Sequence, residues 1–182
     1  MYSTAAANSA WADYLFVHEF GHHFAGLADE YYTSAVAYET PRDIVEPYEP
    51  NVTALLDAHA LKWRELVTGA TPLPTPWPKE AFEKQSRAYQ DRREAMRAAD
   101  VPEAEMNALF RDEQAYVEGL FSRARYRDVI GAFEGANYQA QAYYRPAMNC
   151  LMFSRSHAFC RVCADAIDDV IDEYSREAPA LP

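Results

Sequence analysis

Near the start of the chain, aromatic, apolar and histidine side chains recur at steps of three and four residues, the spacing of one face of an α-helix. The residues in this pattern are Trp11, Tyr14, Leu15, His18 and His22. They predict a helix that begins at Asn8 or Ser9 and ends at about Ala25. Gly26 follows, and glycine commonly ends a helix because it adopts the left-handed backbone conformation at little cost.

The middle of the chain predicts a helical hairpin. Residues 71–80, TPLPTPWPKE, form a stiff and extended connector. Two amphipathic helices are expected after it, at about 79–99 and 102–125, and we expect them to pack against the domain rather than to form a free arm. Another helix is predicted after Asn51, with one face made by Leu55, His59, Trp63 and Leu66.

The last third of the chain predicts a loop and a final helix. Residues 131–153 are rich in glycine and tyrosine and lack periodicity, which indicates a structured loop. The final helix is expected from about Ser156 to Arg176. Its inward-facing residues would be Phe159, Cys163, Ile167, Val170 and Tyr174. With little sign of strands, the pattern predicts one mainly α domain over residues 1–182.

The charge balance limits the expected partners. The 182 residues carry 17 basic and 28 acidic side chains, a formal net charge of −11. A surface of this sign repels phosphate backbones, so we expect no nucleic-acid partner. No apolar run approaches the roughly 18 residues that a membrane-spanning helix needs, so no membrane span is expected.

A metal-binding motif lies within FVHEFGHHFAGLADEYY, residues 16–32, which holds three of the five histidines. His18, Glu19 and His22 form the pattern H-E-x-x-H. Residues four apart share one face of a helix, so both imidazoles can reach one ion. Glu19 would lie beside the ion, where it can take a proton from a water molecule. The competing interpretation is a chance match in which both histidines are ordinary core residues.

A third ligand is predicted just after the helix. In the metzincin pattern H-E-x-x-H-x-x-G-x-x-H/D, the third ligand lies three residues beyond a glycine. Here alanines hold both of those positions, but the interval recurs one residue later, from Gly26 to Asp29. Asp29 is therefore the expected ligand. Glu30 is the main alternative, and His23 is a weaker one because it lies about 100° around the helix from His22.

Three blocks of the sequence resemble the IgA peptidase family of bacterial zinc metallopeptidases, within the metzincin group. They are HEFGHHFAGLADEYY, GAFEGANYQAQAYYRPAMNCLM and FCRVCADAI, in this order. The resemblance implies a zincin-like catalytic domain, α+β in the full family, with one catalytic zinc. It also implies a methionine turn beneath the metal, for which Met152 is favoured and Met148 is the reserve. Because only 17 residues precede His18, we expect a domain truncated before this helix, without its N-terminal sheet subdomain.

The implied activity is that of a zinc endopeptidase acting on a protein or peptide substrate. Glu19 would serve as general base for the attack of a zinc-bound water on the peptide carbonyl. Tyr138 and Tyr144 are the candidates for stabilising the oxyanion. The alternative function is a non-catalytic helical interaction module, in which zinc is structural or absent. A structural site would be closed by a fourth protein ligand.

The cysteines allow two interpretations. Cys150, Cys160 and Cys163 are odd in number, so one internal disulfide leaves one thiol over. Because the family is largely secreted, a disulfide from Cys150 to one of the other two is favoured over a structural zinc site that would include His157. The resemblance also implies a location outside a bacterial cell or in its envelope. The sequence leaves the protein substrate and the oligomeric state open.

Overall fold

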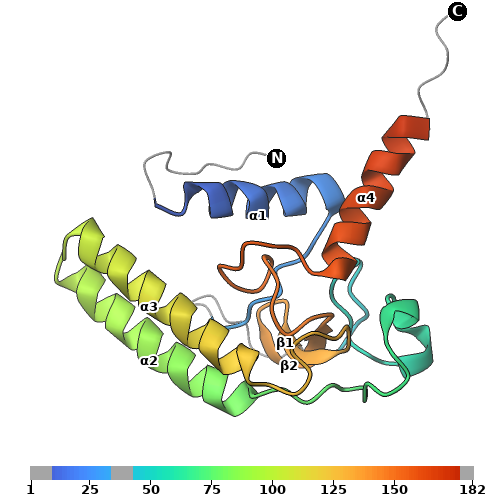
Figure 1. Ribbon diagram of the computed structural model, residues 1–182, viewed down its shortest axis with the longest axis horizontal. Coiled ribbons are helices and arrows are strands. Elements are labelled where there is room, and N and C mark those ends of the chain that lie inside the picture. Colours follow the sequence, from blue (N-terminus) through green and yellow to red (C-terminus); the bar gives the residue numbers. More distant parts are fainter. Residues whose placement is uncertain (1–9, 34–42, 177–182) are drawn as a thin grey trace, which may run out of the picture.

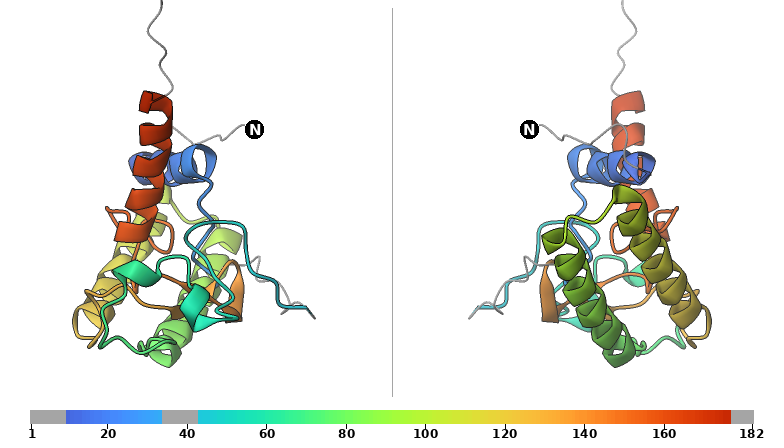
Figure 2. Two further views of the ribbon diagram at one scale, coloured as in Figure 1. Left: turned by 90° about the vertical axis from the view of Figure 1, so that its right-hand side faces the viewer. Right: turned by 90° about the vertical axis from the view of Figure 1, so that its left-hand side faces the viewer.

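The computed structural model of the chain describes residues 10–33 and 43–176. In this part, four α-helices, two 3-10 helices and two strands follow one another in the order α1, η1, η2, α2, α3, β1, β2 and α4. Figures 1 and 2 show α1 and α4 together above a small β-hairpin, with the long helices α2 and α3 side by side along another flank. Among the described residues, no helix is both long and apolar enough to cross a membrane.

The first predicted helix is confirmed as α1, Ala12–Ala25. Its predicted start at Asn8 or Ser9 lies outside the described residues. Gly26 ends the helix in the left-handed conformation, with φ of 62°. The buried residues of α1 are His18 and Gly21, so the helix turns the face of the metal-binding motif toward the interior.

The predicted helical hairpin is also confirmed. It consists of α2, Lys79–Ala98, and α3, Glu103–Ser122. The hairpin packs against the domain as expected, because Phe82 of α2 and Phe121 of α3 belong to the main hydrophobic cluster together with Phe153. The exposed fractions of these three rings are 6, 4 and 4%.

The helix predicted after Asn51 is wrong. Only two short 3-10 turns form there, η1 (Ala58–Ala60) and η2 (Arg64–Leu66), and His59 is exposed. The segment before them is used differently, since Thr53 forms an antiparallel bridge with Tyr144 of the sheet. Trp63 still reaches the core, where its indole N–H donates to the carbonyl of Gly131 at 2.6 Å.

The loop predicted over residues 131–153 contains the sheet. Strand β1, Phe133–Ala136, pairs with β2, Gln139–Arg145, in antiparallel register. Asn137 and Tyr138 connect them with φ of 51° and 63°. Two central residues with positive φ are characteristic of the type I′ hairpin turn, whose twist matches that of the strands.

The final helix is shorter than predicted. α4 spans Arg161–Arg176, so the predicted start at Ser156 is wrong. Cys163 is buried as expected, but Tyr174 is 73% exposed and does not face inward. The reason is visible in Figure 1, where the first turns of α4 lie in the domain and its last turns project beyond it.

A buried arginine ties the sheet to the aromatic core. The side chain of Arg145 is 0% exposed, and its guanidinium carbon lies 3.7 Å from the ring centre of Phe153 and 4.2 Å from that of Trp77. The guanidinium donates to the carbonyls of Gly135 at 2.8 Å and Met148 at 3.2 Å. Backbone carbonyls and aromatic faces therefore replace the water that this cation loses.

Replacing Gly135 by alanine tests the packing of this hairpin. Gly135 has φ of 102°, and a Cβ there would overlap the ring of Tyr32. We expect Gly135→Ala to lower the free energy of unfolding by about 2–4 kcal/mol, measured by urea denaturation. Gly69→Ala is the matched control, because a Cβ at Gly69 meets nothing within 4 Å. Equal stability of the two variants would contradict the contact between Gly135 and Tyr32.

Candidate metal centre

The segment that leaves α1, residues 27–32, carries the key side chains of the site. Beyond Gly26 its side chains alternate between two sides, as along a strand. Asp29 and Tyr31 lie toward the histidines of α1. The residues on the other side are buried, with exposed fractions of 7, 0 and 3%: Ala28, Glu30 and Tyr32.

A buried asparagine fixes the position of this segment. The side-chain oxygen of Asn51 accepts from the N–H of Ala28 at 2.8 Å, and its amide nitrogen donates to the carbonyl of Ala28 at 2.9 Å. The same nitrogen donates to Glu30 Oε1 at 3.0 Å. On the opposite flank, the N–H of Glu30 donates to the carbonyl of Met152 at 2.9 Å. The backbone on either side of Asp29 is therefore held in place.

The turn of the β-hairpin docks on the same segment. The N–H groups of Asn137 and Tyr138 donate to the carbonyls of Asp29 and Tyr31, each at 3.0 Å. This docking brings the hydroxyl of Tyr138 to Asp29 Oδ2, to which it donates. The sheet thus supports the carboxylate directly.

Three ligand atoms converge in front of α1. His18 Nε2 lies 2.9 Å from Asp29 Oδ1, His22 Nε2 lies 3.2 Å from the same oxygen, and the two Nε2 atoms are 3.1 Å apart. In a tetrahedral zinc site with bonds of about 2.0–2.1 Å, ligand atoms stand about 3.3 Å apart. The three distances therefore fit a single small ion. The structure therefore brings together the three residues that were predicted from the sequence as metal ligands.

Backbone carbonyls orient both imidazoles for this role. His18 Nδ1 donates to the carbonyl of Leu151 at 3.2 Å, and His22 Nδ1 donates to the carbonyl of Leu27 at 2.6 Å. Because a carbonyl only accepts, each Nδ1 carries the proton. In the neutral rings, both Nε2 atoms then present lone pairs to the same point as the carboxylate of Asp29. Such a convergence is unfavourable unless a proton or a metal cation lies between the atoms.

The pKa values of Asp29 and His22 reflect the close contact of these side chains. Burial favours the neutral acid at Asp29, but three hydrogen bonds outweigh it and lower the pKa of Asp29. Their donors are His18, His22 and Tyr138. Burial likewise opposes the charged form of His22, but hydrogen bonds to Asp29 and a backbone carbonyl, followed by the charges of Asp29 and Glu19, raise its pKa above 6.5. The proton that this raised pKa keeps on His22 is what a metal must displace.

Two further predicted residues lie on α1 or against it. Glu19 is half-buried on α1, and its negative charge acts on His22. Met152 is fully buried and lies against Gly21, where a Cβ would stand only 3.1 Å from the methionine sulfur. Met152 therefore packs against α1 at Gly21. Met148 is also fully buried, but its carbonyl accepts a hydrogen bond from the guanidinium of Arg145.

The two candidate tyrosines have different surroundings. The Tyr138 hydroxyl contacts Asp29 and lies 3.3 Å from that of Tyr31. Tyr144 belongs to the ladder of the sheet, opposite Glu134 and beside Thr53. The structure therefore brings Tyr138, but not Tyr144, to the cluster.

The sequence missed two residues of the site. The ring of Tyr31 stacks on His18, with ring centres 6.2 Å apart, and its alternation with Asp29 along the segment was the available signal. Asn51 has no signal in the sequence, because it acts only through a contact 23 residues away.

The alternative ligands do not join the cluster. Glu30 lies on the other side of the segment and contacts Asn51 and Cys163. His23 is exposed on α1. The predicted disulfide is not formed either, because Cys150 Sγ and Cys163 Sγ are 3.7 Å apart and all three cysteines are free. His157 is exposed and contacts Gln114, so it does not join the cysteines.

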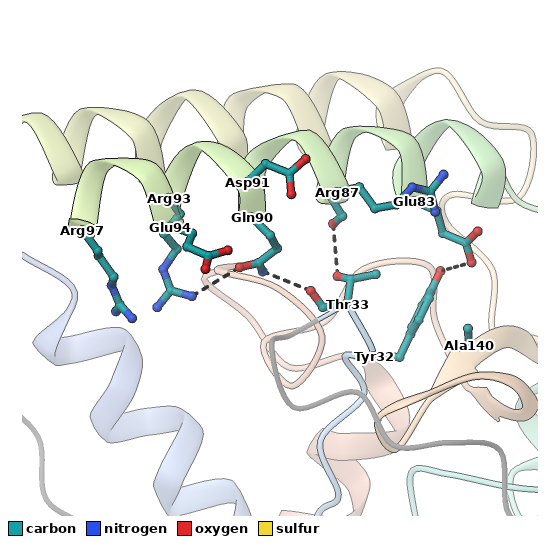
Figure 3. A pocket seen from close by; sticks show the side chains of 11 residues that line it. Tyr32, Thr33, Glu83, Arg87, Gln90, Asp91, Arg93, Glu94, Arg97 and Ala140 are labelled. Carbon is teal, nitrogen blue, oxygen red and sulfur yellow. Dashed lines mark hydrogen bonds between the residues drawn. The ribbon is translucent and has the colours of Figure 1, made fainter. Parts of the chain in front are cut away.

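A groove of about 660 Å³ runs along α2 beside the segment that follows Asp29. Figure 3 shows acidic and basic side chains of α2, from Glu83 to Arg97, on one wall and Tyr32 with Thr33 on the other. Tyr32 donates to Glu83 at 3.3 Å across this groove. None of the three ligand residues lines it.

The fold and the site define a mainly helical domain with a candidate centre for one metal ion. Residues 1–171 match the family model described as IgA Peptidase M64. The chain therefore belongs to this family of peptidases, which confirms the resemblance seen in its sequence. A comparison with curated proteins found no match.

We expect metal binding at His18, His22 and Asp29 to weaken as the pH falls. Only neutral histidine binds a metal, and the pKa of His22 lies above 6.5, so protons compete at a higher pH than for a free histidine. The apparent Zn²⁺ affinity, measured by competition with a chromophoric chelator, should fall about tenfold per pH unit below that pKa. A constant affinity between about pH 8 and pH 5 would contradict this coupling.

Tyr138→Phe separates two candidate roles of this tyrosine, support of Asp29 and stabilisation of the oxyanion. Its hydroxyl holds Asp29 Oδ2, so its loss should lower metal affinity about 10–100-fold, measured by the same competition. Tyr48→Phe is the control, because Tyr48 is 98% exposed. A lower kcat with unchanged metal affinity would show instead that Tyr138 acts only on the oxyanion.

Proposed function

We propose that the chain is a zinc-dependent endopeptidase that hydrolyses peptide bonds in a protein or peptide substrate. The observation that carries the proposal is the convergence of three lone pairs, from His18, His22 and Asp29, with both imidazole protons turned away to backbone carbonyls. Within the part of the chain that the structure describes, this group of metal-ligating side chains has three members, His18, His22 and Asp29. Three protein ligands suit a catalytic site, because zinc keeps one position for water or substrate.

Zinc bound by these residues would supply a Lewis acid for the water and for the scissile carbonyl. Glu19 takes the proton of the attacking water and returns it to the leaving amine. Tyr138 and the backbone of residues 27–32 keep Asp29 in place. The carbonyls of Leu27 and Leu151 keep both imidazoles in the tautomer that binds metal.

We extend the proposal to the zincin-like architecture of the catalytic domain and to a location outside the cell or in its envelope, both on the basis of the family.

The zinc content of two matched variants tests the metal centre. We expect Asp29→Ala to hold one zinc equivalent fewer than the wild-type chain, measured by elemental analysis after gel filtration, because one of three ligands is lost. Glu113→Ala is the control, since Glu113 is a largely buried acid on α3 whose partner is Gln85. Equal zinc in the wild-type chain and Asp29→Ala would contradict this ligand set.

Glu19→Gln tests the chemistry separately from the metal. The amide cannot accept the proton of water, so hydrolysis of casein should fall by about 10²–10⁴-fold. Zinc content should stay that of the wild type, because Glu19 is not one of the three ligands. Full activity in this variant, or no hydrolysis by the zinc-loaded wild-type chain, would overturn the proposed activity.

A further inference from the structure

A second group of metal-ligating side chains lies behind the segment that carries Asp29. Glu30, Cys150, Cys160 and Cys163 place one ligand atom each within 4.8 Å of all the others. Glu30, Cys150 and Cys163 are 0% exposed, and Cys160 is half-buried. Successive side chains of the segment point to opposite sides. Asp29 therefore contacts the histidines, whereas Glu30 contacts the cysteine group.

The distances within this group match a metal site better than a disulfide. Cys150 Sγ and Cys163 Sγ are 3.7 Å apart, and Cys163 Sγ lies 3.3 Å from Glu30 Oε1. Zn–S bonds of about 2.3 Å in a tetrahedron place two sulfurs about 3.8 Å apart and a sulfur and a carboxylate oxygen about 3.5 Å apart. A disulfide needs sulfurs at about 2.05 Å.

The carboxylate of Glu30 is only half satisfied. Asn51 donates to its Oε1 at 3.0 Å, whereas its Oε2 is buried and has no hydrogen-bond partner. Burying a carboxylate oxygen without a partner is costly, and a cation beside it removes that cost. The unpartnered oxygen belongs to a residue that already contacts a cysteine sulfur.

The spacing of the cysteines and a backbone hydrogen bond to one of them fit a zinc site. Cys160 and Cys163 stand in the spacing C-x-x-C at the start of α4, a frequent arrangement in zinc sites. The N–H of Cys160 lies 3.2 Å from Cys150 Sγ and donates to it. The thiolate is the form that binds metal.

We propose that Glu30, Cys150, Cys160 and Cys163 bind a second divalent cation of the zinc class in a closed, four-coordinate site. Thiolate ligands select zinc over magnesium or calcium, and four protein ligands leave no position for a substrate, so this ion is structural. The buried guanidinium of Arg145 acts on Glu30 and Cys150 and offsets part of the negative charge of the ligands. The ion would hold the segment from behind while Asp29 faces the first metal.

The first test uses a chain without the histidine site. His22→Ala should retain about one zinc equivalent, and its cobalt-substituted form should show the ultraviolet absorption of sulfur-to-cobalt charge transfer. Histidine and carboxylate ligands do not give that absorption, so this readout does not depend on the proposed catalytic site. Failure of the catalytic proposal would remove the zinc bound at the histidines but not this signal.

Thiol titration of the wild-type chain, denatured in chelator without reductant, tests the disulfide alternative. We expect all 3 cysteines to react, whereas a disulfide would leave one. One reactive thiol per chain overturns the proposal in favour of the disulfide. Three thiols without sulfur-to-cobalt absorption overturn it in favour of an ordinary thiol core.

Glu30→Gln within the His22→Ala chain tests the carboxylate ligand. The amide keeps the size of the side chain but lacks the charge, so zinc affinity at the cysteines should fall at least about tenfold. Glu113→Gln in the same background should leave it unchanged, because Glu113 lies on α3 and contacts Gln85. Equal affinities in the two variants would remove Glu30 from the ligand set.

Discussion

Everything at the site depends on the alternation of side chains along residues 27–32. Gly26 ends α1, and the chain that follows presents successive side chains to opposite sides. One side delivers Asp29 to the two histidines, and the other places Glu30 among the cysteines. The amide of Asn51 and the turn of the β-hairpin hold the backbone between them. A shift of one residue in this segment would exchange the two carboxylates.

The turn at residues 150–153 is the second support on which the geometry rests. The carbonyl of Leu151 orients His18, the sulfur of Met152 fills the space beside Gly21, and the carbonyl of Met152 accepts from Glu30. Cys150 begins the same turn and belongs to the cysteine group. Four consecutive residues therefore contact α1, the Asp29 segment and the core at once. Glycine at position 21 is what allows the turn to approach the helix so closely.

The sequence predicted what depends on local spacing. The helix α1, the helical hairpin and the group of His18, His22 and Asp29 follow from residues close together in the chain, so periodicity and motif spacing were sufficient. The β-hairpin and the bridge from Thr53 to Tyr144 depend on partners far away in the chain. No residue of β1 is exposed, so this strand lacks the alternation of buried and exposed positions that marks a strand in a sequence. The role of Asn51 was not predicted for the same reason. Its side-chain amide pairs with the backbone of Ala28, far away in the chain, and the residues around Asn51 show no pattern that indicates this contact.

The choice between Asp29 and Glu30 shows how a tertiary constraint decides what spacing cannot. Both carboxylates follow Gly26 closely, and either is long enough to reach an ion in front of α1. The docking of the hairpin turn on the carbonyls of Asp29 and Tyr31 sets which side of the segment faces the histidines. Glu30 must then lie in the interior, where an isolated carboxylate is costly and where the sulfurs of three cysteines surround it. The same constraint that brings Asp29 to the two histidines therefore also places Glu30 among the cysteines.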